Sequence, residues 1–299
     1  MMRGLVLAIF MVWASVAGAQ NCRDVKFGDQ APRPPQNASR DIVGQSLDEI
    51  VERGWILFAV YDEFPPFVFK KDGKAVGIDI DLGRLIAETL GVEARFNIVG
   101  AGENVDADLR NNVWKGPLVS GRVSNVMLHI PYDRELQCRN ELVVLTGHYF
   151  QETIAIAYRK ADYPDGGPTP PYFRYDSVGV ENDSLADFYL SGIANGQIIP
   201  NMTRYDSTED AMAALREGEV KAVMGPLTQL QFGKDAQVAV HQPPLVGLSR
   251  GKWTLGVAVR HSWRPLGYAV DDAIRAAVED GRMAKIFGQY RVEYNAPEW

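Results

Sequence analysis

The hydrophobic pattern of this chain alternates between short continuous apolar runs and segments with a single apolar face. Residues 55–61 form a continuous apolar run after Gly54, which predicts a buried parallel strand. A helix is predicted next, because apolar side chains recur at helical spacing from Leu82 to Leu90. Residues 92–98 return to a strand pattern, so this stretch predicts a strand–helix–strand unit with a right-handed crossover.

Capping residues are expected at both ends of that helix. Asp79 or Asp81 is the expected cap at its start, since a carboxylate there accepts hydrogen bonds from the first backbone amides. Gly91 is expected to end the helix in a left-handed turn.

A second α/β unit is predicted farther along the chain. An apolar strand at 178–180 precedes a helical segment at 182–189. Residues 207–210, Ser-Thr-Glu-Asp, resemble a capping box and predict a helix that ends at Gly218, before a strand at 220–224.

A proline-rich loop and three C-terminal elements complete the pattern. Residues 164–171 contain four prolines and two glycines, which predicts a surface loop. A strand at 253–259, a helix at 265–279 and a shorter helix at 286–290 follow, and the sequence has no internal repeat.

The first residues have the pattern of an exported protein. Arg3 and an apolar stretch at 4–16 precede small residues, which predicts a signal peptide over residues 1–19 and a soluble periplasmic product. The apolar stretch is too short to span a bilayer. Residues 20–44 then predict an extended N-terminal arm, and a lipid anchor at Cys22 is the alternative.

The chain has two cysteines, Cys22 and Cys138, and both remain after cleavage. An oxidising compartment favours a disulfide between them, which would stabilise the fold by about 4 kcal/mol in the chain-entropy model. Two unpaired thiols are the alternative.

The charge balance is acidic and argues against some partners. Lys and Arg number 31 and Asp and Glu 38, for a net charge of −7, which becomes −8 when Arg3 leaves with the signal peptide. Nucleic acid and anionic membranes are poor partners for such a surface, whereas a basic partner or plain solubility is consistent with it. About 280 mature residues allow two domains.

Catalytic and metal-binding motifs are absent from the sequence. No Gly-x-Ser-x-Gly, phosphate loop, Cys–His pair or paired-carboxylate motif stands in a supporting context, which predicts a non-enzymatic protein without a cofactor of its own. The histidines lack metal-ligand spacing, so no metal site is predicted. A dehydratase-like enzyme is a weaker alternative, and it would require an acid and a base that converge only in the fold.

Three segments carry a resemblance to a known family. They are residues 61–82, Asp133-Arg134 with the later 147–150, and residues 211–223, Ala-Met-Ala-Ala-Leu-Arg-Glu-Gly-Glu-Val-Lys-Ala-Val, which are similar to the family's second-lobe helix and strand. Together they resemble the family 3 solute-binding proteins over roughly residues 45–295.

This resemblance implies an α/β fold of the bilobed type II periplasmic-binding-protein class. In such proteins two α/β lobes are joined by two hinge strands and close on a ligand. The implied lobe I comprises residues 45–151 and 252–299, and lobe II comprises residues 152–251. The hinges are expected near 149–153 and 249–253.

The resemblance also implies a ligand or partner cleft. Amino-acid-binding members pair an arginine with the ligand carboxylate and an aspartate with its ammonium, because a buried zwitterion needs a partner for each charge. Arg134 stands at the position of that arginine, Tyr61, Phe64 or Phe67 would supply an aromatic platform, and Ser184 keeps a hydroxyl at a helix start.

Two positions of the implied cleft depart from the family pattern. Pro226 stands where the family places its aspartate, and His129 replaces a small hydroxyl residue. A zwitterionic ligand would therefore lack one partner. Two simpler interpretations stay open: Arg134 pairs with a neighbouring acid, Asp133, Glu135 or Glu141, and the aromatic residues merely pack a loop.

Residues 223–227, Val-Met-Gly-Pro-Leu, resemble a subgroup of the family that is associated with quinoprotein alcohol dehydrogenases, most of all the J proteins of methanol oxidation systems. This resemblance implies a periplasmic accessory protein for maturation, assembly or activation of a methanol dehydrogenase, and that partner enzyme would carry pyrroloquinoline quinone (PQQ) and a metal. The alternative is a receptor of an ABC transporter for a small anionic or apolar solute.

Overall fold

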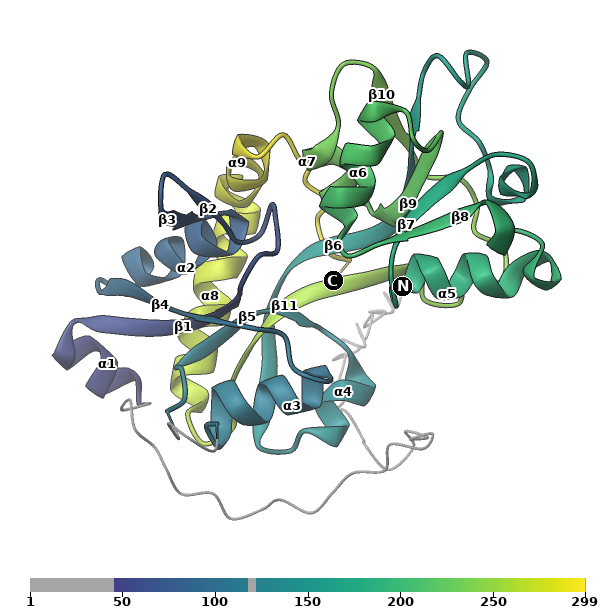
Figure 1. Cartoon of the computed structure of the whole chain (residues 1–299). Helices are drawn as coiled ribbons and strands as arrows, with labels where there is room; N and C mark the ends of the chain where they lie inside the picture. The colour runs from purple at the N-terminus through teal and green to yellow at the C-terminus, as the bar shows by residue number, and fades with distance from the viewer. Residues whose placement is uncertain (1–45, 118–121, 299) are drawn as a thin grey trace, which may run out of the picture.

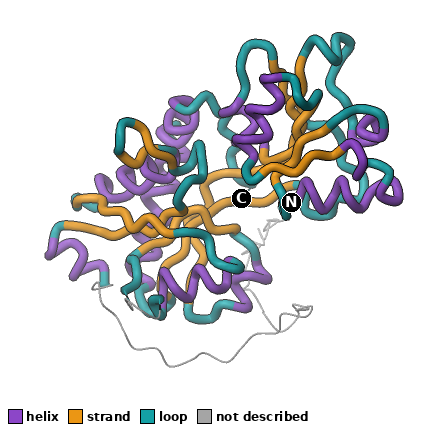
Figure 2. Tube along the Cα trace, in the orientation of Figure 1, coloured by secondary structure: helices purple, strands orange, loops and turns teal. Residues whose placement is uncertain are grey.

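The computed structural model describes residues 46–117 and 122–298, which form two α/β lobes side by side (Figure 1). In each lobe helices cover the faces of a central sheet (Figure 2). The two lobes share strands of one continuous nine-stranded sheet.

The strand order of the large sheet is β4-β1-β5-β11-β6-β9-β7-β8, and β10 pairs with β6. A separate hairpin pairs β2 with β3. The strands are β1 Trp55–Tyr61, β2 Phe69–Lys71, β3 Lys74–Val76, β4 Glu93–Val99, β5 Val126–Pro131, β6 Val143–Arg159, β7 Val178–Glu181, β8 Met202–Tyr205, β9 Ala222–Pro226, β10 Val238–His241 and β11 Lys252–Arg260.

The α-helices are α1 Leu47–Arg53, α2 Ile78–Thr89, α3 Val105–Leu109, α4 Arg134–Arg139, α5 Leu185–Gly192, α6 Thr208–Glu217, α7 Leu227–Gly233, α8 Arg264–Glu279 and α9 Arg282–Gln289. Short helical turns of other types are η2 Arg110–Trp114, η3 Pro170–Arg174, η4 Ile193–Gly196 and η5 Ile199–Asn201.

The long strand β6 runs through both lobes. From Val143 to Thr153 it pairs with β11, and from Ile154 to Tyr158 it pairs with β9. The pairing partner therefore changes between Thr153 and Ile154, at the end of the predicted hinge 149–153. The predicted lobe boundaries at 151/152 and 251/252 stay predictions.

Lobe I has an apolar layer on each face of its sheet. On one face α2, α8 and α9 bury residues such as Ile86, Ile274 and Phe287 against β1 and β11. On the other face Leu109 and Leu136 pack on the strands. Burial on both faces accounts for the continuous apolar run of β1.

Lobe II buries small and β-branched side chains by strand alternation. On β6, Ile154 and Ile156 face the layer that holds Leu190 of α5. Ala155 and Ala157 face the opposite layer, which holds Leu215 of α6. The small alanines let α6 pack close to the sheet.

Most predicted elements of both lobes are confirmed. β1 occupies the predicted residues, and α6 begins at the cap Ser207, whose hydroxyl accepts from the Asp210 amide. Gly91 and Gly218 adopt the left-handed conformation that ends α2 and α6. The predicted strand 220–224 lies two residues later, as β9.

The predicted cap of α2 is wrong. Gly77 is the residue before the helix, and no side chain caps its first amides. Asp79 is fully buried inside the first turn, and Asp81 instead accepts a hydrogen bond from the Tyr290 hydroxyl at 2.7 Å. Both acids are thus engaged with residues far away in the sequence.

The C-terminal tail after α9 lies across both lobes. The Gln151 amide of β6 donates to the carbonyl of Asn295 at 2.9 Å. The Tyr294 hydroxyl donates to the Tyr149 carbonyl at 2.7 Å, and the Glu293 amide donates to the Gln231 side chain of α7 at 2.8 Å. The tail therefore binds the crossing strand and lobe II together.

Several predictions concern residues outside the described part of the chain. The signal peptide at 1–19, the arm at 20–44 and Cys22 lie there. Cys138 is buried in α4 and is not a free thiol, but its pairing with Cys22 stays a prediction. Among the described residues, no helix has the length and apolar character needed to cross a membrane.

Candidate functional site

Four predicted site residues form one aromatic cluster in lobe I, which we define as Tyr61, Phe64, Phe67 and His129. Phe64 and Phe67 stack with ring centroids 5.5 Å apart. The imidazole of His129 meets Phe67 edge-on at 4.1 Å, Phe64 at 4.9 Å and Tyr61 at 6.4 Å. Phe67 is buried, whereas Tyr61 and Phe64 are half-buried and offer their surfaces to solvent.

His129 occupies a strained position in β5. Its φ is 60°, a left-handed value that is uncommon for a residue other than glycine. The register between β5 and β11 shifts here, so that Leu128 and His129 lie opposite the single residue Val257. Bulges and left-handed residues redirect side chains, and both are frequent at functional sites. This backbone turns the imidazole toward the aromatic rings.

A buried acid lies behind the imidazole. Asp79 is 0% exposed, and its Oδ2 lies 3.5 Å from Nδ1 of His129. Its other oxygen, Oδ1, accepts from the Tyr149 hydroxyl at 3.2 Å. Burial and the charge of Asp79 raise the pKa of Tyr149 well above its ordinary value, so this phenol stays a donor. The acid thus holds one edge of His129.

A second buried acid, Glu152, lies on the crossing strand β6. It is 2% exposed, and its Oε1 accepts from the amides of Thr153 at 3.0 Å and Thr228 at 3.4 Å. Burial raises the pKa of Glu152 to about 7, although the Thr228 and Thr153 hydrogen bonds and the charge of His129 oppose that rise. Glu152 therefore joins the crossing strand β6 to the first turn of α7.

Tyr61 is fixed by a third acid. Its hydroxyl donates to Oδ2 of Asp108 at 2.8 Å, and a second oxygen of Asp108 accepts from the Gly102 amide. Burial and the Asp108 carboxylate raise the pKa of Tyr61 far above the ordinary value. The ring is thereby held at the edge of the aromatic cluster.

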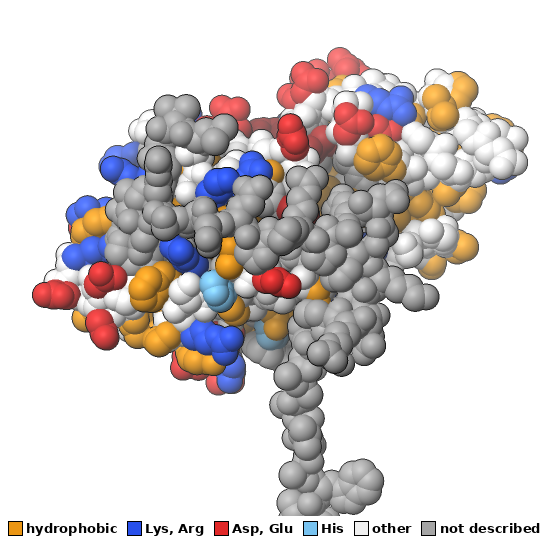
Figure 3. Space-filling model, turned by 90° about the horizontal axis from the view of Figure 1, so that it is seen from below, with side chains coloured by type: hydrophobic (Ala, Val, Ile, Leu, Met, Phe, Trp, Pro, Cys, Tyr) orange, Lys and Arg blue, Asp and Glu red, His pale blue; other side chains and the backbone are white. Residues whose placement is uncertain are grey.

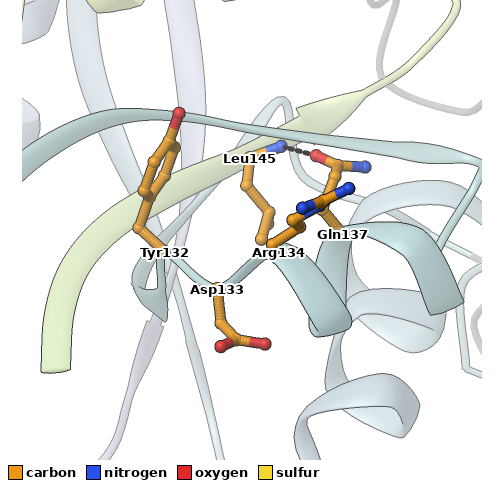
Figure 4. Close-up of a pocket in the computed structure, with 5 residues that line it drawn as sticks. All are labelled: Tyr132, Asp133, Arg134, Gln137 and Leu145. Carbon is orange, nitrogen blue, oxygen red and sulfur yellow. Dashed lines mark hydrogen bonds between the residues drawn. The ribbon is translucent and has the colours of Figure 1, made fainter. Parts of the chain in front are cut away.

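Arg134 is located in a different place, at the first residue of α4. It lines a small pocket with Tyr132, Asp133, Gln137 and Leu145 (Figure 4). This pocket measures about 20 Å³, which is room for a single water molecule. The Asp133 carboxylate points away from the guanidinium in Figure 4 and caps α4 by accepting from the Leu136 amide.

Ser184 and Pro226 lie at helix starts of lobe II. The Ser184 hydroxyl caps α5 by accepting from the Asp187 amide at 3.2 Å. Pro226 ends β9 and precedes α7, with no side-chain cap for that helix. Thr228, two residues farther along, is the α7 residue whose amide donates to Glu152.

The structure therefore assembles part of the predicted site. Tyr61, Phe64, Phe67 and His129 converge, and the other predicted residues occupy separate positions at helix starts. Sequence reasoning missed Tyr149 and Glu152 and assigned Asp79 to a cap. Partners such as Asp79 and His129 are distant in the chain and carry no local motif, and Glu152 stands between the polar residues Gln151 and Thr153, so the sequence gives no signal that this acid is buried.

Metal binding finds no support in this part of the molecule. Within residues 46–117 and 122–298, no three His, Cys, Asp or Glu side chains gather in a way that could hold a metal ion. The acids of the site instead accept hydrogen bonds from hydroxyl and amide donors, and one of them, Asp79, also lies beside the His129 imidazole.

Comparison with known proteins links the first lobe to a family. Residues 56–114 match the model of bacterial extracellular solute-binding proteins, family 3. The chain is also 25% identical over 243 residues to the L-cystine-binding protein TcyJ of Escherichia coli (strain K12), across 79% of this chain and 82% of TcyJ.

Solved structures extend the likeness to both lobes. An ancestral cationic amino acid solute-binding protein matches with a TM-score of 0.64 and 20% identity, over 82% of this chain and 99% of that one. An arginine-bound amino acid ABC transporter substrate-binding protein from Streptococcus pneumoniae matches with a TM-score of 0.57 and 22% identity, over 83% and 98%. The predicted bilobed α/β periplasmic-binding-protein fold is confirmed.

Proposed function

We propose that this chain, which has the fold of solute-binding proteins and matches family 3 over residues 56–114, is a periplasmic receptor that delivers a small solute to an ABC transporter. The proposal fits the names of its relatives, which are amino-acid-binding proteins. A receptor of an ABC transporter is also the alternative function given by the sequence.

The aromatic cluster is the observation that carries this proposal. It lies in and beside the family-matching segment, and a strained residue, His129, completes it. Half-buried aromatic rings with a few oriented polar groups are typical of small-molecule sites. The sequence prediction of an anionic or apolar solute rests on Pro226 and on Arg134 as anchor, and both roles stay predictions.

Calorimetry of the mature protein against a broad panel of solutes tests the receptor function. The panel contains amino acids, amines, carboxylates and apolar alcohols, and we expect micromolar binding of at least one class. Phe64→Ala should weaken that binding, whereas Tyr175→Ala, which truncates an exposed aromatic side chain of lobe II, should leave it unchanged. A panel without any binding solute would reject the receptor.

Arg134 has its own test in the same assay. If it anchors an anionic solute, Arg134→Ala abolishes binding of that solute, and the control Arg174→Ala, an exposed arginine of lobe II, does not. Equal affinities of the two variants for that solute would show that Arg134 does not bind it.

A second candidate function is the accessory role for a PQQ- and metal-dependent methanol dehydrogenase. Two observations favour it: Pro226 carries no charge for a zwitterion, and lobe II exposes large hydrophobic side chains that suit a protein partner. These side chains are Tyr172, Tyr175, Phe188, Ile199 and Val246. Hydrophobic side chains gather at the lobe II end of the face in Figure 3.

Deletion of the gene distinguishes this second candidate from the receptor. An accessory protein predicts loss of active methanol dehydrogenase with unchanged transcription of the enzyme's genes. A deletion strain with full dehydrogenase activity would exclude the accessory role. Neighbouring genes for a quinoprotein dehydrogenase and a cytochrome would favour it, whereas a permease and an ATPase would favour the receptor.

A further inference from the structure

The β2–β3 hairpin of lobe I carries a local concentration of positive charge. Three of the ten lysines in the chain, Lys70, Lys71 and Lys74, lie in it, and all three are exposed. The whole chain has a net charge of −7, so the sign of the charge is reversed here. A basic patch on an acidic protein attracts acidic partners and speeds their association.

The register of the hairpin places two of these lysines directly opposite each other, Lys71 against Lys74. Like charges at opposite positions of a β-ladder destabilise it, and an acid at either position would remove the repulsion. The turn between them, Asp72-Gly73, has φ values of 52° and 74°, which are typical of a tight two-residue hairpin loop. The hairpin therefore keeps an unfavourable pair in a well-defined place, which indicates a use for both charges outside the hairpin.

The hairpin lysines are not neutralised within the described part of the molecule. The ion pairs among the described residues include none of the three. Arginines on the neighbouring helices are paired by contrast: Arg84 of α2 lies 2.9 Å from Asp81, and Arg282 of α9 lies 2.7 Å from Asp280. The lysines can therefore bind a partner without breaking an ion pair of this part of the chain.

Phe69 joins the hairpin to lobe II. Its ring centroid lies 5.4 Å from that of Phe232 in α7 and 6.1 Å from that of Tyr290, which follows α9. Figure 1 shows the hairpin beside α9. Phe69 and Phe232 are half-buried. Because side chains alternate along a strand, Lys71 shares the face of Phe69, and so does Lys74 across the hairpin.

Lobe II adds positive charge at the same place. Lys234 follows Phe232 by two residues, directly after α7, and is exposed. The Arg216 guanidinium of α6 donates to the Gly233 carbonyl, next to Lys234, at 2.6 Å. Oδ1 of the following acid, Asp235, accepts from two backbone amides of its own turn. We define the junction surface as Phe69, Lys71, Lys74, Phe232 and Lys234.

The charge around the junction surface stays positive in spite of two bordering acids. These are Asp72 in the hairpin turn and Glu293 of the tail, both exposed. Lys70 and Arg216 add to the three lysines of the surface. An apolar centre with a charged rim is the arrangement of a protein interface, and rim charges mainly set the association rate and its dependence on salt.

We propose that the junction surface docks an acidic segment of a partner protein, which contacts both lobes at once. The aromatic pair receives an apolar side chain of that segment, and the lysines pair with its carboxylates. A protein segment fits better than an anionic membrane, because a membrane repels the chain as a whole through its net charge of −7. This inference goes beyond solute binding, and the outcome of the solute panel does not decide it.

Fluorescence anisotropy with two labelled peptides of about ten residues tests the charge preference. One peptide repeats Glu-Glu-Leu, and the other repeats Lys-Lys-Leu. We expect the glutamate peptide to bind with a Kd below about 1 mM in about 50 mM salt and about tenfold more weakly in about 500 mM salt. The lysine peptide and vesicles of phosphatidylglycerol, the membrane probe, should not bind.

Removal of the lysines assigns the binding to the junction surface. The combined variant Lys71→Gln, Lys74→Gln and Lys234→Gln should lower the affinity for the glutamate peptide about tenfold and weaken its dependence on salt. A control variant removes three exposed positive charges elsewhere and should keep the wild-type affinity: Arg174→Gln, Lys252→Gln and Arg264→Gln.

Reversal of one charge separates docking from folding. Lys71→Glu places opposite charges across the hairpin, so it should raise the melting temperature by about 1 °C. The same variant should lower the affinity for the glutamate peptide about tenfold. A hairpin with only a structural role would show the gain in stability without the loss of binding.

Any of three results would overturn the inference. The first is no binding of the glutamate peptide at about 1 mM. The second is equal affinity of the combined variant and its control for that peptide. The third is binding of the lysine peptide or of the vesicles that is as tight as binding of the glutamate peptide.

Discussion

The starts of two helices, α2 in lobe I and α6 in lobe II, show how differently the lobes use similar sequences. Each helix carries two acids in its first turn. In α6 the acids Glu209 and Asp210 are exposed and Ser207 caps the helix. In α2 no side chain caps the helix, and Asp79 is withdrawn completely from solvent.

The two lobes also neutralise their buried acids differently. Asp187 of lobe II is 4% exposed and pairs with Arg204 at 2.8 Å. Within residues 46–117 and 122–298, the side-chain partners of Asp79 in lobe I are the Tyr149 hydroxyl and the His129 imidazole. Lobe II therefore pairs its buried acid with a permanently charged guanidinium, whereas lobe I pairs its buried acid with a hydroxyl and an imidazole.

Substitution of Gly77, at the start of α2, should give the largest loss of stability. A Cβ at Gly77 would overlap the carbonyl oxygen of Phe67, and the φ of 138° is unfavourable for any side chain. Gly77→Ala should lower the free energy of unfolding by about 5 kcal/mol in urea denaturation. The matched control is Gly91→Ala at the other end of α2, where no atom lies within 4 Å and a cost of about 1 kcal/mol is expected. Equal costs would show that α2 can start elsewhere.

Removal of the buried acid should have the next largest effect. Asp79→Ala leaves the Tyr149 hydroxyl and the His129 imidazole without their partner and should cost about 4 kcal/mol. Glu209→Ala changes the second residue of α6 in the same way but should cost no more than about 0.5 kcal/mol, because that side chain is exposed. A small loss in Asp79→Ala would mean that the buried pair contributes little to folding.

The pH dependence of the free energy of unfolding should have opposite signs for the contributions of Glu152 and Asp187. The pKa of Glu152 is raised from 4.5 to about 7, so between these values the folded protein holds a proton that the unfolded chain has lost. Its contribution to the free energy of unfolding therefore falls as pH rises through this window, by at most about 3 kcal/mol.

Asp187 behaves in the opposite way. Burial raises its pKa, but hydrogen bonds from Arg204 and Ser191 bring the pKa below 3.8, so its stabilising effect is lost as pH falls into the acid range. Denaturation of Glu152→Gln and Asp187→Asn at several pH values separates the two. A Glu152→Gln protein whose stability keeps the wild-type slope between about pH 5 and about pH 7 would contradict this assignment.

The smallest effect is expected at the conventional cap of lobe II. Ser207→Ala removes the acceptor for the Asp210 amide and should cost about 1 kcal/mol. Ser207→Asp keeps an acceptor at the same place and should restore the stability. If Ser207→Ala lowered the free energy of unfolding as much as Asp79→Ala, the starts of α2 and α6 would not differ in their contribution to stability.

Sequence patterns predicted those helices and strands whose formation depends only on neighbouring residues. β1 follows from its apolar run, and the ends of α6 follow from Ser207 and Gly218, because a cap or a left-handed turn needs only its neighbours. The strand β6 was not predicted as one 17-residue element. Its two halves belong to different lobes, so each half is stabilised by pairing with a different strand, β11 or β9.

The candidate site was predicted only in its aromatic half. Tyr61, Phe64 and Phe67 lie close together in the chain, so the resemblance in that segment located them. Asp79 lies 50 positions before His129, and Glu152 meets Thr228 76 positions later. Such pairs exist only once the lobes have formed, and capping rules then give the wrong role for Asp79.

The C-terminal tail gives the molecule a third mechanical link. Two strands, β6 and β11, cross between the lobes, and the tail adds hydrogen bonds to Gln151 on one of them and to Gln231 of α7. Two adjacent crossing strands allow the lobes to twist as well as to bend relative to each other, whereas a third connection restricts the twist. We therefore expect the lobes to bend about one preferred hinge axis.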